Sequence, residues 1–158
     1  VRLNKTLLLL TKIENGQFPE SRPIALGSFI EEQAELYNEI YADRGLSCET
    51  DIQEDFTVEM NESLASTLTN NLLKNAFVHS EPGSKIAIIV RPRKLSVSND
   101  GAQPLDADRI FDRFFQGEKK EGSTGLGLAL VKAVCKYYHL ELEYRFDNGR
   151  HCFSVTWP

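Results

Sequence analysis

The chain has 158 residues, of which 41% are hydrophobic and 26% charged, and its formal net charge is −5. This composition is typical of one ordinary globular domain, so it excludes a wholly disordered chain. A general nucleic-acid binder would be basic, so we expect no nucleic-acid partner. A single bound phosphate compound is still compatible with this charge, because glycine loops, helix N-termini and metal ions hold phosphate without net positive charge.

Hydropathy and cysteine content exclude further classes. Apolar runs such as residues 7–10 are far shorter than the roughly 18 residues that span a bilayer, so we expect no direct membrane contact from this chain. Three cysteines form no Cys-x-x-Cys pair, which fits a reducing compartment without structural zinc. The chain starts at Val1 rather than Met and shows no signal peptide, so we interpret it as a fragment.

The first predicted element is an amphipathic helix over residues 1–14. Apolar residues recur along it at steps of three and four, at Leu3, Leu7, Leu10 and Ile13. Gly16 is a natural C-terminal stop. Because Leu8 and Leu9 widen the apolar stripe beyond what one short helix can bury, we interpret this segment as the end of a longer helix from a bundle. The alternative is a helix that packs on its own domain.

A linker over residues 18–23 and a short strand over 24–26 precede the second predicted helix. Ser28 and Glu31 form a Ser-x-x-Glu capping box, so this helix is expected to start at Ser28. The apolar pattern carries it to about Arg44, with Gly45 just past its end. A glycine in that position is a common helix stop.

The middle of the chain is predicted to contain four strands and one helix. Residues 46–52 and 56–60 alternate apolar and polar side chains, which suggests that they are paired strands. Asn61 is expected to cap a helix that extends to about His79. Residues 85–90 and 95–98 then have the pattern of a hairpin.

The C-terminal third begins with a glycine-broken stretch over residues 99–124, and loops of that length in a compact domain are usually functional. A third main helix is expected over 126–139. Strands over 141–146 and 152–156 follow, joined by an Asn148-Gly149 hairpin turn. Together these elements predict an α/β (α+β) two-layer sandwich, in which three helices cover one face of a mixed, mainly antiparallel sheet.

Two amides lie one helical turn apart on the helix that Asn61 caps. Asn71 and Asn75 fall within about 20° of Leu64 on a wheel of roughly 100° per residue, at the edge of the apolar stripe. Buried amides need partners, so both could bond a neighbouring strand or loop. Alternatively, their oxygens face a polar ligand or a hydrated metal, as suits Mg²⁺ carried by phosphates.

Residues 122–128 form a glycine-rich segment that opens the helix at 126–139. Glycines allow close approach to a ligand, and a helix N-terminus offers free N–H groups to an anion. A merely flexible loop would look similar. The segment lacks the Gly-Lys-Ser/Thr of a Walker loop, and it follows a polar loop near the C-terminus, unlike a Rossmann loop.

Two other segments have both a structural and a functional interpretation. Residues 99–101, Asn-Asp-Gly, end a predicted strand and by themselves indicate a turn. Residues 110–115 place three phenylalanines in a loop, either as a satellite hydrophobic cluster or as the hinge of a mobile lid. Among the histidines, His139 and His151 are interpreted as surface or structurally satisfied side chains.

In this order, the four motifs resemble the N, G1, F and G2 boxes of the nucleotide-binding domain of sensor histidine kinases, a Bergerat ATP-binding fold of the gyrase-type ATPase superfamily. The boxes correspond to residues 71–76, 99–101, 110–115 and 122–128. The resemblance implies that residues 1–18 are the C-terminal stub of a dimerisation and phosphoacceptor helix. It also implies that residues 19–158 are a catalytic ATP-binding domain.

The same resemblance implies ATP and Mg²⁺ as cofactors and assigns roles. Asn75 would hold the Mg²⁺ that bridges the triphosphate, Asn71 would support it, and both would be catalytic. Asn99 would face the adenine amine. The remaining implied nucleotide-binding residues are His79, Gly101, Phe111, Phe114, Thr124, Gly125, Leu126 and Gly127. Of these, Phe111 and Phe114 would anchor a short lid over residues 116–121, of kinase-like length.

Three positions depart from the family pattern. Asn99 stands where the family usually has Asp, so it would accept from the adenine amine without a charge. Gln103 replaces the second glycine of the G1 box, so the loop on the adenine side must be built differently. Val78 replaces a common basic residue, with His79 beside it.

Three functions follow from these observations. The first is a protein-histidine kinase domain that transfers the ATP γ-phosphoryl group to a histidine on a helical domain outside this chain. Its partners would be that helical domain, which forms a homodimer, and a response regulator, in the cytoplasmic part of a membrane-anchored sensor. The second is an ATP-hydrolysing switch, which Asn71 disfavours because an amide is no general base. The third is a non-catalytic nucleotide-binding or interaction module.

Overall fold

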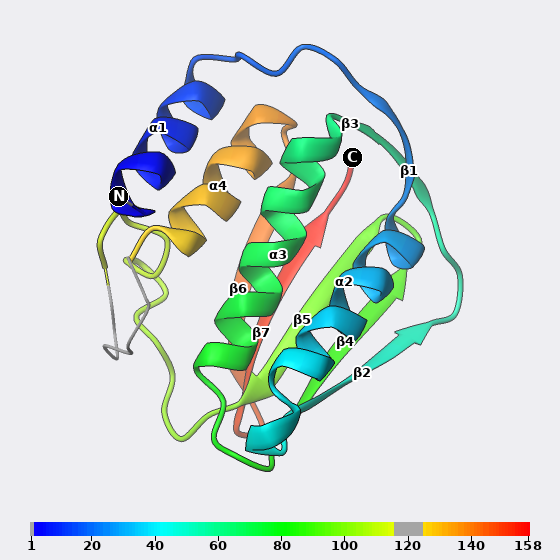
Figure 1. Ribbon diagram of the computed structural model, residues 1–158, viewed down its shortest axis with the longest axis vertical. Helices are drawn as coiled ribbons and strands as arrows, with labels where there is room; N and C mark the ends of the chain where they lie inside the picture. Colours follow the sequence, from blue (N-terminus) through cyan, green and yellow to red (C-terminus); the bar gives the residue numbers. More distant parts are fainter. Residues whose placement is uncertain (1, 116–124) are drawn as a thin grey trace.

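The computed structural model describes residues 2–115 and 125–158, which form two layers (Figure 1). One layer is a five-stranded sheet with the order β2-β4-β5-β7-β6. Its strands are β2 (Ser47–Ile52), β4 (Lys85–Arg91), β5 (Lys94–Asp100), β6 (Glu141–Asp147) and β7 (Arg150–Thr156). The helices α2 (Leu26–Ile40), α3 (Glu62–Val78) and α4 (Gly127–Tyr137) cover one face. Only the β2–β4 pair is parallel among the described strand pairs, so the predicted fold class is confirmed.

The core lies between this sheet and the helices. Alternate residues of β5 and β7 point at the helices, so Leu95 and Val97 face Val155 and Phe153 across the ladder, all of them buried. On α3, Leu68 and Leu72 are buried against this layer. Burying a leucine side chain stabilises the fold by about 1.5–3 kcal/mol. This packing fixes which face of α3 turns inward and therefore where its polar edge lies.

The strand pairing expected between residues 46–52 and 56–60 is wrong. β2 instead runs parallel to β4, from Ser47 opposite Lys85 onward. β3 (Thr57–Met60) pairs antiparallel with β1 (Arg22–Ala25) in a separate two-stranded sheet. Alternation identifies a strand but not its partner. Parallel neighbours need a long crossover connection, here the one that contains α3, so the true partner of β2 lies far along the sequence.

The expected capping box at Ser28 and Glu31 is also wrong. Helix α2 begins at Leu26, its N-cap residue Ala25 offers no side-chain bond, and a 3-10 turn at Ala42–Arg44 follows it separately. The capping acceptor is Asp55, whose carboxylate accepts hydrogen bonds from the backbone N–H groups of Gly27 (2.6 Å) and Ser28 (3.1 Å). By contrast, the predicted cap of α3 is confirmed, because the Asn61 side chain accepts from the N–H groups of Ser63 and Leu64.

We expect Asp55→Ala to lower the free energy of unfolding by about 1–2 kcal/mol, the usual cost of losing a helix cap. Burial raises the pKa of Asp55, but hydrogen bonds from Gly27, Phe56 and Ser28 outweigh burial and hold this pKa below its ordinary value of 3.8. The stabilisation is therefore present above pH 3.8 and is lost as the pH falls through the lowered pKa. Urea unfolding of the parent protein and of Asp55→Ala, at pH values above and below 3.8, measures the effect. Glu54→Ala, at the exposed neighbouring residue, is the control. An equal loss of unfolding free energy in Glu54→Ala would contradict the assignment of Asp55 as the cap of α2.

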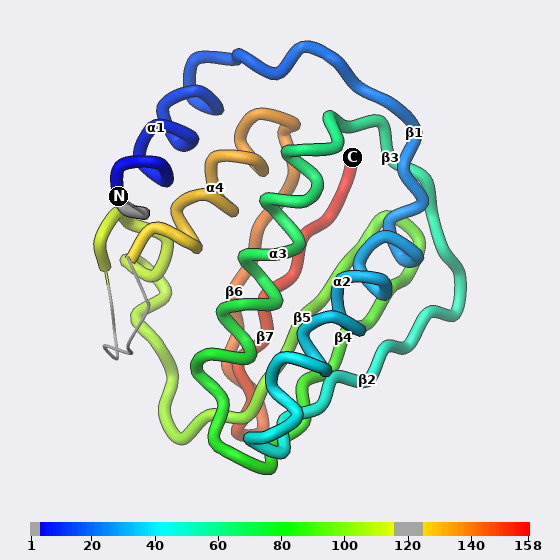
Figure 2. Tube along the Cα trace, viewed as in Figure 1, coloured from blue at the N-terminus to red at the C-terminus, as the bar shows by residue number. Residues whose placement is uncertain are grey.

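Helix α1 (Arg2–Glu14) lies beside α4 (Figures 1 and 2). Leu10 and Ile13 are each 1% exposed and belong to the domain core, whereas Leu8 is 56% exposed. The apolar stripe is thus divided between the core and the outside. The helix ends as predicted, because Gly16 takes a φ of 68°, a conformation that favours glycine. The assignment of residues 1–18 to a dimerisation helix stays a prediction.

Within the described parts of the chain, no helix is both long and apolar enough to cross a bilayer.

Candidate functional site

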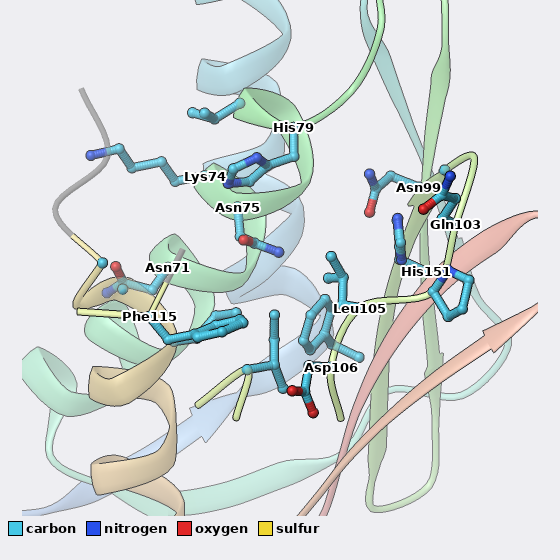
Figure 3. Close-up of a pocket in the computed structure, with 18 of the residues that line it drawn as sticks. Asn71, Lys74, Asn75, His79, Asn99, Gln103, Leu105, Asp106, Phe115 and His151 are labelled. Atoms are coloured by element: carbon cyan, nitrogen blue, oxygen red, sulfur yellow. The ribbon is translucent and has the colours of Figure 1, made fainter. Parts of the chain in front are cut away.

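A cavity of about 890 Å³ lies between α3, the N-terminus of α4 and the ends of β5 and β7 (Figure 3). Pockets of about 300–1,000 Å³ are typical of small-molecule sites. Seven of the residues singled out by the sequence line it: Asn71, Asn75, His79, Asn99, Gly101, Gly125 and Gly127. Ile110 and Phe115 line it too, so residues from all four motifs meet around one space.

The polar edge of α3 forms one wall of this cavity. Asn71 donates from Nδ2 to the backbone oxygen of Thr67 at 2.7 Å, so its bond goes to its own helix. This bond leaves Oδ1 facing α4, where a methyl group on Gly127 would lie 3.2 Å from it. The Asn75 amide points into the cavity (Figure 3), and its side chain makes no hydrogen bond to any residue that the structure describes. Two amide oxygens thus remain available to a ligand.

The N-terminus of α4 forms the adjoining wall. The helix starts at Gly127, and its N-cap residue Leu126 supplies no side-chain cap. The first N–H groups of a helix lack intrahelical acceptors and attract anions. The side chain of Leu126 is buried in the core and does not line the cavity.

Gly125 closes the loop that leads into α4. It takes a φ of 75°, and a methyl group there would lie 2.7 Å from the Cα of Phe114. Its backbone oxygen accepts a hydrogen bond from the Phe114 N–H at 2.7 Å. Close backbone contact and positive φ together require glycine at this position. Thr124 and the predicted lid over 116–121 lie outside the described residues.

The phenylalanines of residues 110–115 divide into three environments. Phe111 packs edge-on against Phe153, with ring centroids 6.0 Å apart. Phe114 is 53% exposed and does not line the cavity. Phe115, the one phenylalanine of the three to which the resemblance assigns no role, does line it, and the guanidinium of Arg109 lies 4.9 Å from its ring centroid. The lid-anchoring roles of Phe111 and Phe114 stay predictions.

The end of β5 forms the far wall. Asn99 is only 2% exposed, and its Nδ2 donates to the Asp100 backbone oxygen at 3.3 Å, which leaves Oδ1 available. The Asp100 carboxylate accepts from Arg150 at 2.6 Å and is already paired. Any side chain at Gly101 would overlap the imidazole of His151, so this position also needs glycine.

His151 is structurally satisfied, as expected, but it also lines the cavity, which its sequence context does not predict. It stands directly opposite Asn99 in the β5–β7 ladder, lines the cavity, and is half-buried, and burial lowers its pKa. Its Nδ1 lies 2.8 Å from the hydroxyl of Tyr144. His139, by contrast, is exposed at the end of α4, as expected. His151 reaches the cavity because it pairs with Asn99 across the β5–β7 ladder, and no local sequence pattern predicts that pairing.

A family model described as histidine kinase-, DNA gyrase B- and HSP90-like ATPase matches residues 60–158. The chain belongs to this family. Its curated relatives include the sensor-like histidine kinase SenX3 of Mycobacterium tuberculosis, 27% identical over 139 residues, which covers 81% of this chain and 34% of the relative. They also include the heme sensor protein HssS of Staphylococcus saprophyticus, 28% identical over 162 aligned positions, with 98% and 35% covered. The chain therefore spans about a third of the length of these relatives.

Solved structures of the histidine kinase branch of this family share the fold. The cytoplasmic segment of histidine kinase QseC gives a TM-score of 0.77 at 16% identity and covers 98% of this chain and 93% of that chain. The Acinetobacter baumannii histidine kinase AdeS gives 0.76 at 21% identity, with 97% and 75% covered. The resemblance to the catalytic domain of sensor histidine kinases is confirmed.

Proposed function

We propose that this domain binds Mg²⁺–ATP and transfers the γ-phosphoryl group to a histidine on a separate helical domain. The observation that carries this proposal is the arrangement of the cavity. The α3 amides and the α4 N-terminus meet at one end of the cavity, which suits the triphosphate of a nucleotide. Asn99 faces the other end, which suits the base. Membership of the ATPase family supports the same ligand.

The residues at the phosphate end fit a metal ion that arrives with its phosphates. Asn75 offers an oxygen without a protein partner in the described chain, and amide oxygens are ligands that Mg²⁺ accepts. The described residues contain no cluster of three or more His, Cys, Asp or Glu that could hold a metal by themselves. When bound, the ion would neutralise phosphate charge. Asn71, whose Oδ1 faces α4, would support that ion from the same helix as Asn75.

Backbone groups supply the rest of the phosphate end. Gly125 and Gly127 line the cavity where α4 begins, and phosphate oxygens would approach the N–H groups of the first turn of α4 there. We propose the same contact for the backbone of Leu126 and for the Thr124 hydroxyl. His79, at the C-terminal end of α3, lines the cavity beside Asn75 and would contact the same part of the nucleotide. Catalysis of phosphoryl transfer depends mainly on positioning the phosphates and stabilising their charge. The residues named here provide contacts of both kinds.

An ATP-hydrolysing switch is disfavoured. Water activation needs a general base beside the γ-phosphate, and an amide at Asn71 cannot take a proton at neutral pH. Nδ2 of Asn71 is also held by Thr67. Transfer to an acceptor on a partner domain therefore fits the site better than hydrolysis.

The partners belong to this proposal as well. We propose a homodimer through the helical phosphoacceptor domain that α1 would continue, a response regulator downstream, and a cytoplasmic location as part of a membrane-anchored sensor. The exposed Leu8 on α1 is compatible with a further helix beside it.

Incubation with γ-labelled ATP and Mg²⁺ tests the proposed transfer. The chain alone should stay unlabelled, because none of its histidines has the acidic neighbour of an acceptor. Adding the separately produced helical bundle of its parent protein should give acid-labile label on the bundle. The same bundle with its acceptor histidine replaced by glutamine is the control. Label on His79, His139 or His151 would contradict the assignment, and phosphate release without the bundle would favour the switch.

A further inference from the structure

The inner face of the sheet changes character at the cavity. Along β5 the helix-facing residues run from Leu95 and Val97 to Asn99, and the last of these faces His151 on β7. Apolar pairs thus give way to one polar pair in the final row. Cross-strand partners on one face have closely spaced side chains, so Asn99 and His151 would contact neighbouring atoms of a ligand bound in the cavity.

The hydrogen bonds around His151 favour one tautomer. The Leu105 N–H donates to the Tyr144 hydroxyl oxygen at 2.9 Å, and an amide N–H can only donate. The phenolic proton is then free to be donated to His151 Nδ1, 2.8 Å away. A neutral imidazole that accepts at Nδ1 carries its proton on Nε2. The Tyr144 and Phe146 rings pack on the imidazole, at centroid distances of 5.9 and 5.1 Å, and hold its orientation.

Nε2 of His151 remains open to the cavity. It makes no hydrogen bond to the residues in 2–115 and 125–158, and within them the only fully buried side-chain nitrogen or oxygen without a partner is Trp157 Nε1. The imidazole occupies the space that a side chain at Gly101 would fill, so the glycine is what admits the ring to this wall of the cavity. The cavity wall therefore presents a donor from His151 next to an acceptor, Oδ1 of Asn99.

We propose that His151 is a base-reading residue, whose Nε2–H donates to a ring nitrogen that flanks the adenine amine while Asn99 accepts from that amine. This inference rests on the proposed ATP site. Adenine offers the matching pattern, a donor amine on C6 with acceptors at N1 and N7 on either side. Guanine presents a carbonyl in place of the amine and a donor at N1, so the pair opposes it. Tyr144 is the positioning residue, because it sets which imidazole nitrogen carries the proton.

Calorimetry with ATP, 1-deaza-ATP and 7-deaza-ATP tests the contact against the parent protein and His151→Phe. A neutral hydrogen bond contributes about 0.5–1.5 kcal/mol, so His151→Phe should weaken ATP binding by up to about tenfold. One deaza analogue should weaken binding to the parent by a similar factor and cause no further loss in His151→Phe. Which analogue does so identifies N1 or N7. Additive losses with both analogues would overturn the proposal.

Two further variants separate contact from packing. His151→Gln retains an N–H donor and should recover most of the affinity and the sensitivity to one deaza analogue, whereas a purely structural role predicts no such recovery. Tyr144→Phe keeps the ring and removes the hydroxyl, and should reduce the sensitivity to that analogue because the imidazole tautomer is released. His139→Gln, at the exposed histidine, is the matched control and should bind all three nucleotides like the parent. A parent that failed to bind ATP would refute the proposed function itself, whereas ATP binding without analogue coupling would refute only the role of His151.

Discussion

Asn75→Ala is expected to weaken Mg²⁺–ATP binding by about 10- to 100-fold. Its amide faces the cavity without a partner in the described chain, so the oxygen is available to the metal–phosphate group. Interactions with charged groups contribute about 1.5–3 kcal/mol each, which corresponds to this range of affinity. Calorimetry with and without Mg²⁺ measures the effect, and the loss should be largest when Mg²⁺ is present.

Asn70→Ala is the matched control for this substitution. Asn70 is the same residue type on the same helix, but its side chain donates to Ser66 Oγ at 2.9 Å and does not line the cavity. It should leave ATP affinity within about twofold of the parent, since an interaction outside the site changes binding by only a few tenths of a kcal/mol. Equal ATP affinity with and without Mg²⁺, or no loss in Asn75→Ala, would refute the metal assignment.

Asn99→Leu is expected to weaken ATP binding by about tenfold or more, whereas Asn99→Asp should stay within about tenfold of the parent. Leucine removes the acceptor and leaves the adenine amine desolvated, and an unsatisfied buried donor costs about 1–3 kcal/mol. Aspartate keeps an acceptor in the same place. GTP should bind poorly to the parent protein because it presents a carbonyl oxygen where ATP presents its amine. Competition titrations with ATP and GTP measure both effects.

If GTP competed equally, or Asn99→Leu bound ATP like the parent, Asn99 would not read the base. Asp100 would be the next residue to test. Its carboxylate is bonded to Arg150, so it would have to leave that ion pair to reach a nucleotide. This arrangement favours Asn99 over its neighbour.

The helices and most strands could be predicted because their signals are local. Leucine spacing identifies α3, and Asn61 caps it with its own side chain. Strand partners and the cap of α2 could not be predicted in this way. The carboxylate of Asp55 reaches Gly27 from 28 residues away, and only the folded loop brings them together.

The same distinction applies to the site. Asn71 and Asn75 share one helix face, so their spacing alone predicts that they act together. His151 reaches the cavity through the β5–β7 register, and Phe115 through a loop that Gly125 closes. Lys74 also lines the cavity, although it lies off the line of the two amides. For His151 and Phe115, position depends on long-range pairing, so a single sequence carries no periodic signal for them.

The backbone bond between Phe114 and Gly125 has a consequence for insertions. It links the loop that carries Phe115 directly to the residue that leads into α4, so these two parts of the cavity wall are held together by a bond of their own. The entropy of closing a flexible loop grows only logarithmically, by about 0.6 kcal/mol for each doubling of its length. Residues added between Phe115 and Gly125 are therefore expected to cost little stability and to leave the bond between Phe114 and Gly125 in place.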